Sequence, residues 1–324
     1  MKSTTKSPAV SNQHTPARVS NHGVDPKTPV WRFMNLARLF DLLNRERLFF
    51  TPVNALMRMD PYECSRVIDY DLDGLDRDAL TYRANEMYPF AKLEAERTIP
   101  NKDPEPYYRD KINQMSLEEL RALVLRLSLR KRTSRIWCSC WYINDCGGES
   151  DAMWRLYAQE HGVAIQSNVE KLASSLKSPS ECQLPPQIHL ARIRYLNDED
   201  EPEAPFYAEN PWMIKRKSFS HEQELRLFTG CGDSIPIDVE SLIQSIVITP
   251  LAADWAQDSI KFAIEAIFSS RGRAKPTIIH SQHLNAPDHV FRLLQMPAEK
   301  IRLYRASVLS PSLAMKVRRK SKSS

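Results

Sequence analysis

Hydrophobic positions along the chain recur with the period of a helix in three long segments. Leucine and phenylalanine follow helical spacing over residues 34–47, and leucine and valine do so over residues 116–131. Ser116 and Glu119 match a capping box, in which both side chains bond to free amides at the start of a helix. A third amphipathic helix is predicted over residues 255–268.

Runs of apolar or alternating residues between turn signals predict strands. The predicted strands cover residues 47–50, 135–143, 163–166, 188–195, 222–229, 244–249 and 276–280. Two further helices are predicted over residues 150–161 and 168–176, and we expect Gly162 to end the first in a left-handed conformation. The segment from Asp60 to about residue 110 is polar and proline-rich, so we expect it to wrap the surface.

This mixture of elements predicts an α+β fold with a mixed, mostly antiparallel sheet and helices packed against it. Order is expected to begin at Trp31, after a disordered leader over residues 1–29. One domain is expected over residues 30–310, followed by a disordered basic tail over residues 311–324.

Composition and charge narrow the setting of the protein. The 324 residues are 42% hydrophobic and 26% charged, as in ordinary globular proteins. Residues 1–29 carry a net charge of +3 and residues 315–324 a net charge of +5, against +5 for the whole chain, so the remainder is acidic. The ends are therefore expected to contact polyanions weakly and without sequence preference. No apolar run is long enough to span a membrane, no secretory signal is present, and six cysteines in a chain this long indicate reduced thiols in a cytoplasmic protein.

Several familiar kinds of site are disfavoured. Cys138, Cys140 and Cys146 lack the spacing of a structural zinc site, so we expect no bound metal. His221 and Glu222 begin like a zinc-protease motif, but Leu225 stands where the second histidine should be. Only eight glycines occur, without a dinucleotide fingerprint or a phosphate-binding loop.

A magnesium-dependent nuclease is a minor alternative. Asp60, Glu63 and Asp145 could join Glu222 and Glu224 around the ion. Turn formation explains Asp60 and Asp145 more simply, because aspartate is common in turns.

Glu222 and Glu224 are the strongest chemical lead. They lie two residues apart in a predicted strand, and that spacing directs both carboxylates to one face. Two adjacent carboxylates raise one pKa and can divide the work of stabilising positive charge and accepting a proton. The alternative is that they form the solvent face of an amphipathic strand, paired with Lys215 or Arg216.

Five segments in order resemble a known family. They are Trp31–Met34 (WRFM), Asp60–Glu63 (DPYE), Glu149–Tyr157 (ESDAMWRLY), Gly162–Ser167 (GVAIQS) and His221–Leu227 (HEQELRL). In this order they are similar to the bacterial family catalogued as domain of unknown function 2971, over roughly residues 31–285. The resemblance implies an accessory bacterial protein, often in mobile or defence settings, without implying an activity.

The spacing Glu-x-Glu is also similar to that of ADP-ribosyltransferases. In that superfamily an arginine holds the NAD phosphates, a serine supports the nicotinamide ribose, and the second glutamate faces the ribose. The resemblance implies Arg32 for the phosphates, Ser139 for the ribose, Glu224 as the catalytic carboxylate and Glu222 as its assistant. NAD would then be the co-substrate of a transferase or glycohydrolase.

Two aromatic residues complete the predicted site. Trp154 or Tyr157 could stack on the nicotinamide ring, although core packing is the alternative for both. The enzyme hypothesis requires Arg32 and Glu224 to face one cleft. It also expects Glu224→Gln to abolish nicotinamide release while leaving the thermal midpoint nearly unchanged. The rival hypothesis is a non-catalytic binding or sensor module in a bacterial defence or regulatory system.

Overall fold

The computed structural model describes residues 15–60, 63–64, 72, 74–99, 102–145, 147–178, 186–197, 200, 205–281 and 283. The chain divides into two compact units, residues 1–280 and 281–324, and the first contains every helix and strand described here. Residues 1–14 of the predicted leader, the predicted domain end at 310 and the basic tail over 311–324 lie outside the described residues.

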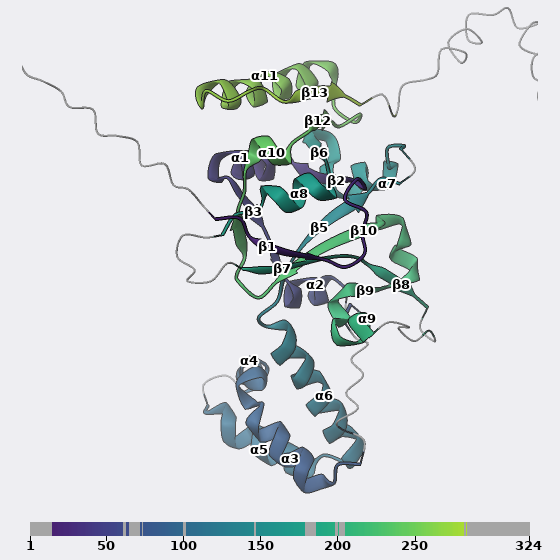
Figure 1. Ribbon diagram of the computed structural model, residues 1–324. Coiled ribbons are helices and arrows are strands. Elements are labelled where there is room, and N and C mark those ends of the chain that lie inside the picture. The colour runs from purple at the N-terminus through teal and green to yellow at the C-terminus, as the bar shows by residue number, and fades with distance from the viewer. Residues whose placement is uncertain are drawn as a thin grey trace, which may run out of the picture. The chain divides into compact units, whose positions relative to one another are not determined.

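The described strands build a nine-stranded mixed sheet (Figure 1). In spatial order they are β1 (Arg18–Asn21), β7 (Gln187–Arg192), β10 (Glu224–Thr229), β5 (Trp137–Ile143), β2 (Pro29–Asn35), β6 (Gly162–Asn168), β12 (Ser245–Ile248) and β13 (Thr277–His280), and β4 (Thr51–Pro52) pairs with the start of β5. Only the β1–β7 and β12–β13 pairs of this sheet are parallel. The predicted α+β fold with a mostly antiparallel mixed sheet is confirmed.

Two short strand pairs flank the sheet. β3 (Arg47–Phe49) pairs with β11 (Ser234–Pro236), and β8 (Arg194–Leu196) pairs with β9 (Ile214–Arg216). The β8–β9 pair matters for the site because β9 carries Lys215 toward the start of β10.

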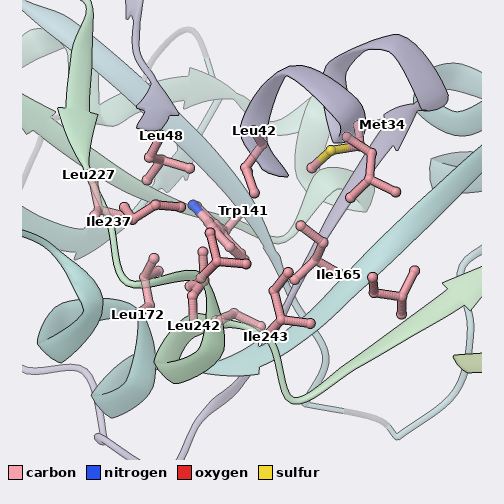
Figure 2. Close-up of a cluster of buried hydrophobic side chains, with 14 of the residues drawn as sticks. Met34, Leu42, Leu48, Trp141, Ile165, Leu172, Leu227, Ile237, Leu242 and Ile243 are labelled. Atoms are coloured by element: carbon pink, nitrogen blue, oxygen red, sulfur yellow. The ribbon is translucent and has the colours of Figure 1, made fainter. Parts of the chain in front are cut away.

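Helices cover one face of the sheet and bury the largest apolar cluster. They are α1 (Leu36–Arg45), α8 (Val169–Ser175), α10 (Val239–Leu242) and α11 (Asp254–Ser270). Figure 2 shows Leu42, Leu172 and Leu242 of these helices against Trp141 and Ile165 of the strands. The helical spacing in the sequence therefore marks the residues that meet this face.

The start of the ordered chain differs from the prediction. Residues 18–21 form β1, an edge strand parallel to β7, and Val24 is buried in the main apolar cluster. Order therefore begins before Trp31. The polar, serine- and proline-rich composition hides β1, because an edge strand contributes few apolar side chains.

The segment expected to wrap the surface is largely helical, so that prediction is wrong. It follows α2 (Val53–Met59) and contains α3 (Arg77–Glu86), α4 (Tyr88–Thr98) and most of α5 (Pro104–Gln114), and α6 (Leu117–Thr133) comes after it. The last four pack together around their own apolar cluster (Figure 1). Asp76 and Asp103 cap α3 and α5, and Pro104 occupies the first turn of α5, where proline is tolerated. The capping box of Ser116 and Glu119 at α6 is confirmed.

None of the helices in the described part of the chain is long and apolar enough to cross a membrane.

Candidate functional site

Glu222 and Glu224 converge on one lysine, although they do not share a strand. Glu222 ends the short 3-10 helix η5 (Lys217–Glu222), Gln223 is left-handed with φ 39°, and Glu224 begins β10. The predicted strand over 222–229 therefore starts two residues later. The Lys215 ammonium lies 2.5 Å from Glu222 Oε2 and 3.0 Å from Glu224 Oε2. The pairing with Lys215 agrees with the alternative hypothesis, but the predicted solvent-exposed face is wrong, because the two carboxylate side chains are only 10% and 4% exposed.

Arg226 holds the carboxylate of Glu224 from the other side. Its Nε donates to Glu224 Oε1 at 2.6 Å and its Nη2 to Glu224 Oε2 at 3.0 Å. The same guanidinium reaches Glu63 Oε1 at 2.7 Å and the Trp212 carbonyl at 2.5 Å, and it is fully buried. Our sequence analysis missed Arg226. The available signal was its position two residues after Glu224, which places both side chains on one face of β10.

The pKa directions of Glu224, Lys215 and Arg226 favour the charged form of each group. Burial would raise the pKa of Glu224, but Arg226 and Lys215 outweigh it and lower that pKa to about 2. Burial would lower the pKa of Lys215 and of Arg226, but the neighbouring carboxylates raise both. Three glutamates face two cations here, so the network keeps one formal negative charge.

Tyr157 connects this buried network to the surface. Its hydroxyl donates to Glu222 Oε1 at 2.9 Å, while the residue remains 44% exposed. Burial of the hydroxyl and the charge of Glu222 raise the pKa of Tyr157. The phenol therefore stays protonated and donates to the carboxylate.

Trp154 sits deeper than Tyr157 and has no exposed surface. Its indole nitrogen donates to Glu149 Oε2 at 2.8 Å, and its ring meets Phe33 edge-on with centroids 4.8 Å apart. It belongs to a cluster with Trp31 and Tyr142. This placement agrees with core packing and leaves Trp154 no free face for a nicotinamide ring.

The helix predicted over residues 150–161 is irregular. A short α7 (Asp151–Met153) passes into the π-helix η2 (Trp154–Ala158) and then the 3-10 turn η3 (Gln159–His161). Gly162 is extended with φ −115°, so the predicted left-handed cap is wrong; Gln159 has the positive φ instead, at 57°. Glycine is needed at 162 for space, because a Cβ there would lie 2.2 Å from the Ala158 carbonyl oxygen.

Arg32 and Ser139 lie together, as the resemblance to ADP-ribosyltransferases implied. Arg32 Nη1 donates to Ser139 Oγ at 2.6 Å, and Nη2 donates to the Phe49 carbonyl at 3.2 Å. The guanidinium also lies over the Trp141 ring, 5.6 Å from its centroid. Burial lowers the pKa of Arg32 to about 10, which leaves it charged at neutral pH.

The structure nevertheless separates Arg32 and Ser139 from the glutamates. Tyr142 pairs with Glu224 on one side and with Trp31 on the other, so these three side chains share a face of the sheet. Arg32 follows Trp31 in β2 and therefore points to the opposite face. The hydrogen bond to Ser139 agrees with this. Ser139 lies three residues before Tyr142 in β5, so its side chain also points away from the face that Tyr142 and Glu224 share. The three strands are neighbours, but their predicted site residues do not face one cleft.

The residues considered for magnesium each have a cationic partner. Asp60 pairs with Arg216 at 3.0 Å, Glu63 with Arg226, and Asp145 with Arg192 at 2.7 Å. Within the described ranges, no group of three or more histidine, cysteine, aspartate or glutamate residues is arranged to hold a metal ion.

Of the cysteines near the network, Cys64 and Cys138 are buried and Cys140 is partly buried. Burial raises the pKa of Cys138 and of Cys140, and it raises the pKa of Cys64 to about 12. Cys146 lies outside the described residues.

A comparison with protein families finds a match to part of the chain. Residues 153–227 match the family described as "Protein of unknown function (DUF2971)", which confirms the resemblance over that part of the predicted span. That span contains Trp154, Tyr157, Lys215, both glutamates and Arg226. Among curated proteins, none matches the chain.

Two solved structures show a weak likeness to the chain. DarT from Thermus sp. 2.9 in complex with carba-NAD+ has a TM-score of 0.31 at 10% identity, covering 80% of this chain and 98% of that one. The same DarT in complex with ADP-ribosylated ssDNA has a TM-score of 0.32 at 9% identity, covering 81% and 97%. A likeness at this level transfers neither ligand nor activity to this chain.

Proposed function

We propose that this chain, whose residues 153–227 match the DUF2971 family, is an NAD-consuming enzyme of the ADP-ribosyltransferase-like or glycohydrolase type. The reaction would break the bond between nicotinamide and ribose. Positive charge develops on the ribose in the oxocarbenium-like transition state of such a reaction, and a fixed carboxylate beside it lowers the barrier.

The observation that carries the proposal is the position of Glu222 in a network with surplus negative charge. Its carboxylate is held by Tyr157 on one oxygen and by Lys215 on the other. Glu224 forms ion pairs with both Arg226 and Lys215 and is the more buried of the two glutamates. Glu222 is therefore assigned the charge-stabilising role, with Glu224 orienting Lys215 behind it.

Tyr157 is the aromatic residue suited to meet the substrate. It is 44% exposed beside Glu222, whereas Trp154 is buried. A half-exposed tyrosine offers one ring face for stacking on a planar base. Arg32 and Ser139 have no part in this arrangement, because they project from the other face of the sheet.

The test is nicotinamide release by the purified full-length protein incubated with NAD. Glu222→Gln keeps the volume of the side chain but removes its charge, and we expect release to fall by about 100-fold or more. Glu118→Gln is the matched control, because Glu118 is an exposed glutamate on α6. Release by Glu222→Gln at the rate of the unmodified protein would exclude this assignment.

A non-catalytic binding or sensor module is the second candidate, and one observation favours it. The glutamates are matched by Lys215 and Arg226, and Arg32 lies on the opposite face, as expected if the charges only build the fold. This candidate requires that the unmodified protein release no nicotinamide from NAD. It also requires that Glu222→Ala retain the biological phenotype.

A further inference from the structure

The turn that carries Tyr157 contains a strained residue. Gln159 has φ 57° and ψ −156°, a combination that is occupied almost only by glycine. It follows η2 directly. π-helical turns are rare in proteins, and those that occur are often found at functional sites. A conformation this costly persists only where the surrounding structure imposes it.

Thr249 imposes this conformation from the end of β12. Its hydroxyl donates to the Gln159 carbonyl at 2.8 Å, and its backbone N–H donates to the Gly162 carbonyl at 3.1 Å. Thr249 is fully buried, so water does not compete for these bonds. The missing Cβ of Gly162 lets the Ala158 carbonyl approach, which closes the turn.

This turn determines the position of the Tyr157 hydroxyl. Tyr157 lies two residues before Gln159 and reaches Glu222 Oε1 at 2.9 Å, across 65 residues of sequence. We infer that Thr249 is a positioning residue, which through the backbone carbonyl of Gln159 holds the π-helical turn in the geometry that keeps the Tyr157 hydroxyl on Glu222. The catalytic value of this contact rests on the proposed function, but the positioning itself does not.

The inference is tested on the full chain labelled with fluorotyrosine, with the Tyr157 resonance assigned by its loss in Tyr157→Phe. In the unmodified protein this resonance should titrate well above the other exposed tyrosines, because burial and Glu222 raise the pKa of Tyr157. Thr249→Val removes the hydroxyl at nearly constant volume, and we expect the titration to move down by about one pH unit or more. Thr249→Ser keeps the hydroxyl and should restore the original titration.

The second variant addresses the strain. Glycine adopts the observed conformation without cost, so Gln159→Gly should raise the thermal midpoint and leave the Tyr157 titration unchanged. Should the valine variant not fold, Thr249→Cys provides the same comparison with a much weaker donor. An unchanged Tyr157 titration in the valine or cysteine variant overturns the positioning role of Thr249. A lower thermal midpoint in Gln159→Gly contradicts the claim that the backbone of Gln159 is strained.

Nicotinamide release separates this inference from the proposed function. If the protein consumes NAD, Thr249→Val should lower kcat more than it raises KM, and Thr249→Ser should recover kcat. If the unmodified protein releases no nicotinamide, the proposed function fails, while the Tyr157 titration still decides the positioning role.

Discussion

Glu222 and Glu224 carry the same charge but differ in their burial and in their partners. Glu224 is buried and bound by two cations, whereas Glu222 lies at the end nearer the surface beside Tyr157. Removing one partner of a buried ion pair weakens the charge compensation of the groups that remain, which is costly. The earlier expectation that Glu224→Gln leaves the thermal midpoint nearly unchanged therefore does not suit this structure.

Glu224→Gln should destabilise the fold by about 3–5 kcal/mol, because fully buried Arg226 loses both hydrogen bonds to a charged acceptor and keeps only Glu63, while Lys215 keeps only Glu222. Urea unfolding measures the difference. Glu118→Gln should change the free energy of unfolding by less than about 0.5 kcal/mol, since exposed sites contribute little. Equal stability of the Glu224 variant and the unmodified protein would show that the network is not charged as described.

The depressed pKa of Glu224 predicts a pH dependence with a definite sign. Its pKa is about 2 in the folded protein against an ordinary value of 4.5, so ionisation of Glu224 stabilises the fold fully above pH 4.5. This contribution, on the order of 3 kcal/mol, is lost as the pH falls from 4.5 toward 2. The gap in unfolding free energy between the unmodified protein and Glu224→Gln should narrow over that interval. A constant gap would contradict the prediction.

At the level of elements, the segment from Asp151 to Gly162 shows where sequence patterns stop being informative. Ser150 as a cap and the start of a helix were predictable, and Ser150 does accept from the Met153 amide. The change to a π-helix was not predictable, because it depends on Thr249, which lies 90 residues away from Gln159. A helix-ending glycine and a glycine required for close approach look identical in sequence.

Gly162→Ala should destabilise the protein by about 1–3 kcal/mol, because the added methyl would overlap the Ala158 backbone, which cannot move aside like a flexible side chain. Gly148→Ala is the control, since a Cβ at Gly148 meets nothing within 4 Å. Thermal unfolding of the two variants gives the comparison. Similar midpoints would show that the turn relaxes around the methyl group.

Elements with a strong apolar stripe were predicted well, and those without one were not. The leucines of α1 and α6 marked both helices, and the start of α6 followed from Ser116 and Glu119. By contrast, α3 and α5 bury only a few residues each in a cluster shared with α4 and α6, so the polar sequence of α3 and the proline-containing sequence of α5 resemble loops.

At the scale of the whole sheet, the two faces carry different chemistry. The order Arg32, Ser139 and Glu224 along the chain does correspond to three neighbouring strands. Which face each side chain takes depends on register, and a shift of one residue exchanges the faces. The sequence could indicate the neighbours, but not that Trp31 rather than Arg32 shares a face with Glu224.

Ser139→Ala should therefore leave nicotinamide release within about 2-fold of the unmodified protein, since the lost hydroxyl bonds Arg32 on the far face. Arg32→Met should likewise retain release per folded molecule, which is checked by measuring the folded fraction by circular dichroism. A loss of release in Ser139→Ala comparable to that in Glu222→Gln would mean that both faces contribute to one site.

The pairing of β4 with β5 has a consequence for how this protein tolerates change. Thr51 pairs with Cys138, and the Val53 amide donates to the Ile136 carbonyl, so the chain leaves and re-enters the sheet at adjoining points. The segment from α3 to α6 is therefore an insertion that begins and ends at adjoining points of the sheet. Because closing a longer loop adds only about 0.6 kcal/mol for each doubling of its length, α3, α4 and α5 can be lengthened or shortened without shifting the strand register, whereas α6 shares an apolar cluster with Phe228 of β10 through Leu129.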